Sequence, residues 1–288
     1  MKRNKFKISI ATILTVIMSF GLVTYADTSA VVTLGKDLTS EQKKQMIELF
    51  NVTEDEVTLL EVNNEEERKY LEGVASEGQL GTRTISSSYV ELLDSGSGID
   101  VQTHNISWVT KEMYASALVT AGVQDAKIIA AAPFPVSGTG ALTGVLKAFE
   151  AATGQEISEE QKKVANEEVF QTGELGEEIG QIEASNLVRE VKEKVISENI
   201  KDMEEIKQVI IEIAGDLNIN INADQTEKIA GLMDKINGLN LDRNQITSQL
   251  KDIGNKLDDA LRNNEEVKSL LQRILDTITN FFSSIFKR

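Results

Sequence analysis

Residues 126–140 read AKIIAAAPFPVSGTG: an apolar run broken only by Lys127, then two prolines, a loop of small residues and the start of a helical pattern. Such an apolar run is typical of a buried strand. Pro133 and Pro135 have no backbone N–H group, so the strand is expected to end there. Beyond Gly140 the apolar residues recur at helical spacing. The stretch therefore predicts a buried strand joined to a helix by a glycine-containing loop.

Strand and helix patterns alternate upstream of this stretch. Short apolar and β-branched runs predict strands at 30–34 and 57–62, and Thr39–Gln42 has the sequence of a helix capping box. Residues 82–93 and 99–106 also have the composition of strands, and a short loop with two glycines joins them. Two strands around such a loop predict a β-hairpin.

The rest of the chain has an almost entirely helical pattern. Helix starts are expected at Ser158 and Asn222, each with a glutamine three residues later. The predicted fold class is α+β. It comprises an α+β domain over residues 27–153, a helical region over 154–262 and an amphipathic C-terminal helix over 263–288.

The first 26 residues have the composition of a signal peptide. A basic start precedes the apolar stretch Ile8–Val23, and Thr24-Tyr25-Ala26 offers small residues for cleavage before Asp27. The alternative is a retained membrane anchor, for which the apolar stretch is short. We therefore expect a secreted protein.

The charge and composition exclude several classes of protein. Cleavage would remove four of the 30 basic residues and none of the 46 acidic ones, leaving a net charge of −20. Such a charge opposes binding to nucleic acid. The chain has no cysteine and one histidine, which excludes disulfides, thiolate metal sites and multi-histidine metal sites. No cofactor motif is found, and no cofactor is expected.

The loop before the predicted helix at Gly140 is the first candidate site. Backbone N–H groups at a helix start favour an anion, and Ser137, Gly138, Thr139 and Gly140 could bind a small anionic ligand. The alternative is that Ser137 or Thr139 caps the helix. The loop lacks the lysine of a phosphate-binding loop.

A second candidate is a catalytic triple on the predicted hairpin. Asp100 and His104 lie on the same face of an extended strand, and Ser88 or a neighbouring serine of the partner strand could face the histidine. An exposed histidine on a polar strand face explains the same residues. A wall-active hydrolase that uses carboxylates is a further alternative, although no catalytic residue and no metal ligand stands out among the many acids.

The C-terminal segment 263–288 has one apolar helical face. Its members are Leu271, Ile274, Leu275, Ile278, Phe281, Phe282 and Ile285. The segment carries four basic and three acidic residues, so its net charge is +1. We expect this face to be an attachment element that docks on protein, and a membrane surface is less favoured because the segment has few basic residues. The alternative is that the same face docks on the helices before it in the chain.

Two segments resemble a known family. The stretch that begins at Ser116 and includes AGVQDAKIIAAAPFPVSGTGALTGVLKAFE (121–150) resembles the YpuA-like secreted proteins grouped as domain of unknown function 1002. LMDKINGLNLD (232–242) is similar to a second segment of that family. The resemblance implies a secreted or envelope-associated bacterial protein and supplies no catalytic residues. The first hypothesis is therefore an exported, non-catalytic protein that binds an envelope protein or wall component or gives mechanical support.

Overall fold

A computed structural model gives the structure of residues 30–75 and 81–263. The expected signal peptide (1–26) and all but the first residue of the amphipathic segment 263–288 lie outside these ranges.

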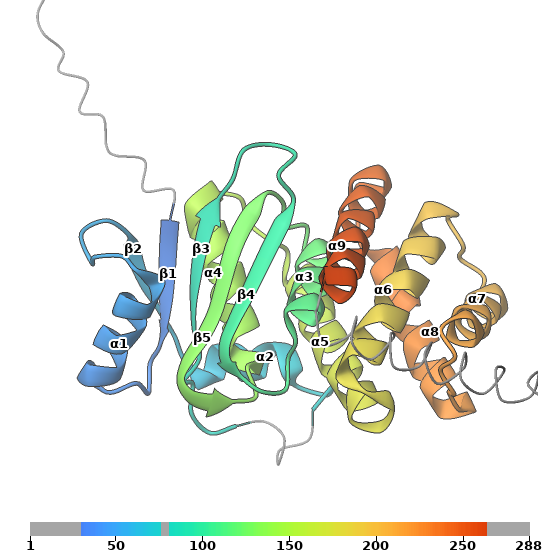
Figure 1. Cartoon of the computed structure of the whole chain (residues 1–288), viewed down its shortest axis with the longest axis horizontal. Coiled ribbons are helices and arrows are strands. Elements are labelled where there is room, and N and C mark those ends of the chain that lie inside the picture. The colour runs from blue at the N-terminus through green and yellow to red at the C-terminus, as the bar shows by residue number, and fades with distance from the viewer. Residues whose placement is uncertain (1–29, 76–80, 264–288) are drawn as a thin grey trace, which may run out of the picture.

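The described part of the chain contains one five-stranded mixed sheet (Figure 1). Its strands are β1 (Ala30–Gly35), β2 (Thr58–Val62), β3 (Ser87–Leu92), β4 (Ile99–Ile106) and β5 (Ala126–Val136). The spatial order is β2-β1-β3-β5-β4, in which β1 and β2 are parallel, β4 and β5 are parallel, and β3 runs antiparallel to both β1 and β5. The α+β class predicted from the sequence is confirmed.

The predicted β-hairpin is wrong, because β5 lies between β3 and β4. Two strand spacings, about 10 Å, therefore separate the expected partners. The reason lies at Asp125, directly before β5, whose Oδ1 accepts hydrogen bonds from the amides of Gly96 (3.0 Å) and Gly98 (2.8 Å). These bonds hold the β3–β4 loop at the start of β5. Strand β5 then pairs with β3 on one side and with β4 on the other.

Strand β5 also continues past its two prolines to Val136, so the expected end at Pro133 is wrong. Beyond Ala131 the strand no longer pairs with β3, and on its other side β4 has a register shift between His104 and Ile106. Prolines are tolerated there because the hydrogen bonds between the strands do not require an N–H donor at these positions.

Nine helices are present in the described ranges. They are α1 (Ser40–Phe50), α2 (Asn64–Leu71), α3 (Lys111–Thr120), α4 (Thr139–Thr153), α5 (Glu159–Ile179), α6 (Gln181–Ser197), α7 (Met203–Asp216), α8 (Ala223–Gly238) and α9 (Arg243–Asn263). Helix α4 packs against β1 and β3, and α1 packs on the other face of the sheet. The predicted capping boxes at Thr39, Ser158 and Asn222 are all confirmed, each with both reciprocal hydrogen bonds.

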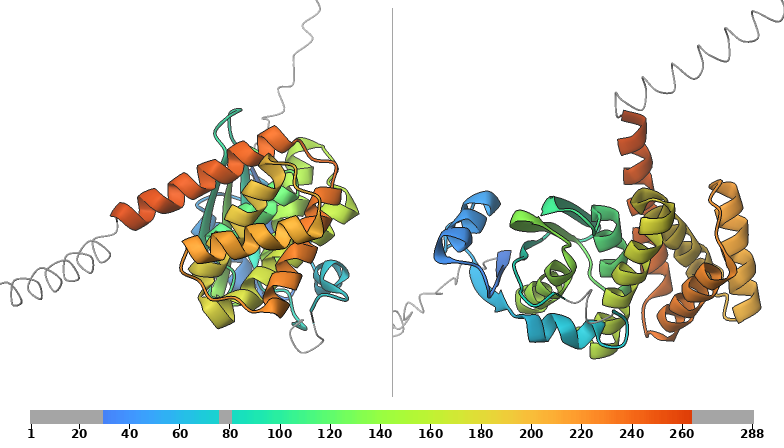
Figure 2. Two further views of the ribbon diagram at one scale, coloured as in Figure 1. Left: turned by 90° about the vertical axis from the view of Figure 1, so that its right-hand side faces the viewer. Right: turned by 90° about the horizontal axis from the view of Figure 1, so that it is seen from below.

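One continuous hydrophobic core joins the sheet to the helical region. It runs from Val31 of β1 through α3, α4, α5 and α6 to Ile253 of α9. Figure 2 shows the sheet and α4 towards one end of the molecule and α7 and α8 towards the other. Helix α3 links the two parts, since it packs against β4 as well as α5, α6 and α9.

Candidate functional site

The start of α4 carries the four residues singled out as an anion-binding loop. Gly138 is the N-cap residue, with a φ of 99° in the left-handed region that favours glycine, and it makes no side-chain cap. The phenolic O–H of the fully buried Tyr114 donates to the carbonyl oxygen of Gly138 at 2.5 Å. Ser137 is exposed, and Thr139 is the first residue of the helix. The expected cap by Ser137 or Thr139 is therefore wrong.

An acid from α2 lies at this helix start. Glu67 is only 6% exposed. Its Oε1 accepts a hydrogen bond from the hydroxyl of Thr139 at 2.7 Å, and its Oε2 accepts a longer one from Thr84 at 3.4 Å. A Cβ atom on Gly140 would lie 2.8 Å from Glu67 Oε2, so the glycine makes room for the carboxylate. The place that the sequence assigned to an external anion is thus filled by a side chain of the protein itself.

Burial dominates the electrostatics of this cluster. The pKa of Glu67 is raised, because desolvation outweighs the hydroxyl groups of Thr139 and Thr84 and the charge of Arg68. Burial also raises the pKa of Tyr114, and the nearby Glu67 adds to this effect. Tyr114 therefore remains a neutral hydrogen-bond donor that fixes the loop.

The sequence analysis missed Glu67 because this acid lies in the charged run 63–68, where sequence alone does not distinguish it from its neighbours. One signal was available. Glu67 lies four residues before the buried Leu71, on the stripe of α2 that faces the core. An acid on a buried stripe requires partners, and the hydroxyl groups of Thr139 and Thr84 provide them.

The structure does not bring the proposed catalytic triple together. Asp100 and His104 are exposed on β4, whereas Ser88 of β3 is fully buried. The register aligns His104 with Ala131 and Ser88 with Ala130, so Ser88 and His104 point to opposite faces of the sheet. Ser88 Oγ instead lies 2.5 Å from Thr33 Oγ1 on β1.

Ser87, one residue earlier, does share a face with His104, but β5 lies between them. The two side chains are therefore two strand spacings apart, about 10 Å. Ser87 Oγ accepts a hydrogen bond from the amide of Gly35 at 3.4 Å.

A buried ion pair that the sequence did not reveal joins α5 and α6 to α3. Lys192 Nζ donates to Glu168 Oε1 at 2.7 Å, to the carbonyl oxygen of Ser116 at 2.7 Å and to Thr120 Oγ1 at 2.9 Å. The hydroxyls of Ser116 and Thr120 donate to Glu168 at 2.6 and 2.5 Å. The pKa of Lys192 is lowered, because burial outweighs the attraction of Glu168. All three lysine donors are satisfied, as a buried charge requires.

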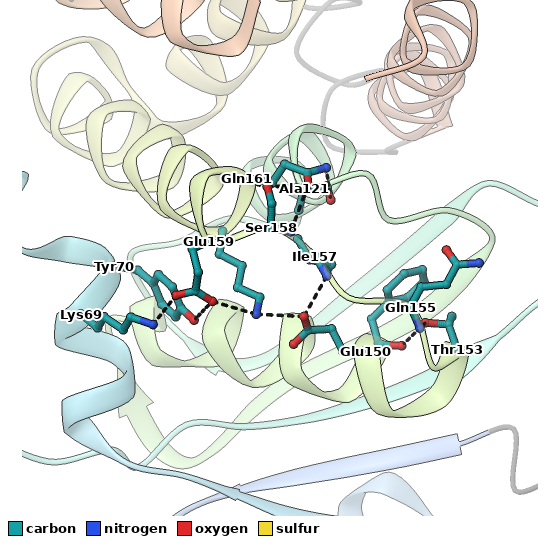
Figure 3. Close-up of polar contacts among 12 residues, drawn as sticks. Lys69, Tyr70, Ala121, Glu150, Thr153, Gln155, Ile157, Ser158, Glu159 and Gln161 are labelled. Atoms are coloured by element: carbon teal, nitrogen blue, oxygen red, sulfur yellow. Dashed lines mark hydrogen bonds and ion pairs between the residues drawn. The ribbon is translucent and has the colours of Figure 1, made fainter. Parts of the chain in front are cut away.

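A second polar cluster holds the loop between α4 and α5 to α4, and the start of α5 to α2 (Figure 3). Glu150 Oε1 accepts from the amide of Ile157 and from Lys162 Nζ, both at 2.8 Å. Glu159 pairs with Lys162 at 3.2 Å and also with Lys69 of α2. These contacts lie within the fold and fix helices to one another.

No group of three or more acidic, histidine or cysteine side chains in the described ranges is arranged to hold a metal ion. None of the described helices is both long and apolar enough to cross a membrane.

Comparison with known proteins gives one family. A family model described as "Protein of unknown function (DUF1002)" matches residues 34–253. A Bacillus subtilis (strain 168) protein described as "Uncharacterized protein YpuA" is 38% identical over 281 residues, which cover 96% of this chain and 96% of that protein. No solved structure matches. The chain therefore belongs to the DUF1002 family of proteins of unknown function, as its resemblance to YpuA-like proteins predicted.

Proposed function

We propose that the protein is exported and acts without catalysis, through binding or structural contacts at the cell envelope. The observation that carries this proposal is the position of Glu67 at the start of α4. The hydroxyl group of Thr139, which is suited to an external ligand there, is directed to an internal carboxylate and donates to it at 2.7 Å. The hydrogen bond therefore links the start of α4 to α2.

Two other buried polar groups also have structural partners. Ser88 is bonded to Thr33, and Glu168 is bonded to Lys192 and two hydroxyl groups. These contacts support a role in which the folded body presents surfaces and does not transform a substrate.

The C-terminal segment is proposed to attach the body to its partner. The apolar stripe of α9 is already buried through Leu257, against α3 and α6. The apolar face of residues 271–285 follows this stripe in the sequence and adds a second set of apolar side chains. We favour docking on an envelope protein or wall component over insertion into lipid, because the net charge of 263–288 is only +1.

Cell fractionation followed by crosslinking tests this function. The producing cells are separated into medium, wall and membrane, and the fraction that holds the protein is crosslinked. We expect a mature protein that begins at Asp27 and a single stoichiometric protein or wall partner. Release of muropeptides by the purified protein would overturn the proposal in favour of a wall hydrolase. A mass that includes Met1 would contradict signal cleavage.

A further inference from the structure

A cavity of about 150 Å³ opens between α5, α6 and α8. It lies away from the start of α4 and from the buried ion pair. Its apolar lining comes from all three helices and consists of Leu175, Val188, Ile229 and Leu232, each at most 7% exposed. At about 30 Å³ per water-sized volume, the space corresponds to roughly five such volumes. It can therefore hold an aliphatic chain of a few carbon atoms.

The same cavity is lined by more negative than positive charge. Glu174, Glu177 and Glu178 contribute carboxylates from the last turns of α5, and Lys228 of α8 contributes one ammonium group. Glu178 accepts a hydrogen bond from Gln225 Nε2 at 2.6 Å. This donor is an uncharged amide and supplies no positive charge. Lys228 pairs with Asp224 at 3.2 Å and is also attracted by Glu174 and Glu178, so three carboxylates and one ammonium group leave the lining with a net negative charge.

A glutamine side chain completes the polar part of the lining. Gln171 lines the cavity, and its Nε2 donates to Glu167 Oε1 at 2.8 Å. That bond sets the orientation of the amide, since a carboxylate can only accept. Gln171 Oε1 is buried and has no hydrogen-bond donor among the described residues. Because this oxygen atom has almost no accessible surface, it does not contact a ligand in the cavity, and the charge of the lining comes from the three glutamates and Lys228.

From this geometry we propose that the cavity binds a primary alkylammonium group carried on an aliphatic stem. The apolar walls fit the methylenes, and the carboxylates favour a cationic head, in the way that lysine stems lie along apolar surfaces while their charge stays near polar groups. A free diamine and a lysine side chain of a basic polypeptide share this chemistry. The net charge of −20 on the mature chain would attract either of them.

This inference deepens the proposed binding role, but the two can fail separately. Binding of a small amine is measured on the purified mature protein and does not depend on where the protein resides in the cell. Fractionation and crosslinking test the location and the partner without reference to the cavity.

Pentylammonium is the first probe, and 1-pentanol is its neutral control of equal length. Titrations followed by amide NMR shifts are expected to show saturable shifts at residues of the cavity, with pentanol binding at least about tenfold more weakly. Equal affinity for the two probes, or no saturable shift with pentylammonium, would overturn the proposal.

Two charge variants make the test specific. Glu174→Gln with Glu178→Gln should weaken pentylammonium binding about tenfold or more. Glu160→Gln with Glu183→Gln removes the same charge from exposed positions on α5 and α6 outside the cavity and should leave the affinity within about twofold. Circular dichroism of both variants checks that the fold is retained. An equal loss of affinity in the two variants would mean that only the net charge of the protein matters, and it would contradict a defined binding site.

A short peptide separates the two sources of the ligand. An acetylated Gly-Lys-Gly amide is compared with its norleucine analogue, which lacks the ammonium group. Lysine-dependent binding as strong as that of pentylammonium supports a basic polypeptide. Binding of pentylammonium without binding of the peptide supports a free amine. Equal binding of the lysine and norleucine peptides would contradict recognition of the ammonium group.

Discussion

Lys192 is the fully buried cation at the junction of α3, α5 and α6, and its three hydrogen bonds all end on buried acceptors. Such a pair is costly to desolvate, so its net contribution to stability is small while both partners are present. Removing one partner has a much larger effect, because it leaves the other charge buried without compensation.

Replacement of Lys192 by methionine should therefore destabilise the protein by about 3–5 kcal/mol, as measured by chemical denaturation. Lys194→Met is the matched control, because Lys194 lies on the same helix and its pair with Glu212 is largely exposed. It should change the free energy of unfolding little. The double variant Lys192→Met with Glu168→Gln should recover part of the loss, since glutamine carries no charge. A Lys192→Met protein as stable as the control would contradict this description of the pair.

Glu67 makes stability depend on pH. Its pKa is raised by burial, so the folded protein binds more protons than the unfolded chain between the ordinary glutamate pKa, about 4.3, and the raised value. The contribution of Glu67 to stability therefore increases as the pH falls through the raised pKa, and decreases as the pH rises through it.

Glu67→Gln removes this titration. We expect the variant to be more stable than the wild type at neutral pH, and we expect this advantage to shrink as the pH is lowered. Denaturation midpoints across the pH range measure the difference. Glu65→Gln, at an exposed position of the same helix, should run parallel to the wild type. A gap between Glu67→Gln and the wild type that widens on acidification would show that the pKa is lowered instead.

At the scale of elements, helix starts were the most predictable features. The capping boxes at Thr39, Ser158 and Asn222 depend only on residues three positions apart, so sequence alone could identify them. The order of the strands could not be identified in this way. It is accompanied by contacts between segments far apart in the chain, such as the bond from the amide of Gly98 to Asp125, 27 residues away.

The candidate site also combines features that the local sequence predicts with features that depend on the tertiary structure. The Gly138 turn and the start of α4 near Gly140 follow from the local sequence. The acid that fills the site comes from Glu67, 72 residues before Thr139 in the chain. The ion pair of Glu168 and Lys192 likewise bridges two helices. Without the tertiary structure, such partners cannot be distinguished from the many exposed acids and lysines.

Packing of α4 on the sheet gives a prediction at Gly144. A Cβ atom there would lie 2.5 Å from Thr33 Oγ1 and 3.1 Å from Ser88 Oγ. Gly144→Ala should therefore destabilise the protein by about 1–3 kcal/mol through overpacking. Gly231→Ala on α8 is the matched control, because a Cβ atom there meets nothing within 4 Å. Its higher helix propensity should stabilise the protein by up to about 1 kcal/mol. Thermal or chemical unfolding measures both, and effects of the same sign would contradict the close approach of α4.

At the scale of the whole molecule, the continuous core predicts cooperative unfolding of the sheet and the helical region. Trp108, the one tryptophan in the chain, lies between β4 and α3 and packs on Phe170 of α5, with 5.8 Å between ring centroids. Its Nε1 donates to Glu177 at 2.8 Å. Its fluorescence therefore reports on the contact between the two parts.

Denaturation followed by Trp108 fluorescence and by far-ultraviolet circular dichroism should give one midpoint. The dichroism is dominated by the helices, so coincidence of the two curves means that the helices unfold together with the junction. A fluorescence transition that precedes the loss of helix would show that the two parts unfold separately.

The attachment proposed for residues 263–288 belongs to this scale as well, and its two faces offer a matched pair of variants. One carries Ile274→Ser, Ile278→Ser and Phe282→Ser on the apolar face. The other carries Gln272→Ser, Thr277→Ser and Asn280→Ser on the polar face. Neither changes the net charge, and denaturation curves show whether either changes the stability of the body.

The distribution of these two variants between the envelope and the medium is the most direct test of envelope attachment without catalysis. We predict that the wild type and the polar-face variant stay with the envelope, and that the apolar-face variant moves to the medium with an unchanged denaturation midpoint. The same distribution for all three proteins, or loss of folding in the apolar-face variant alone, would contradict attachment through this segment.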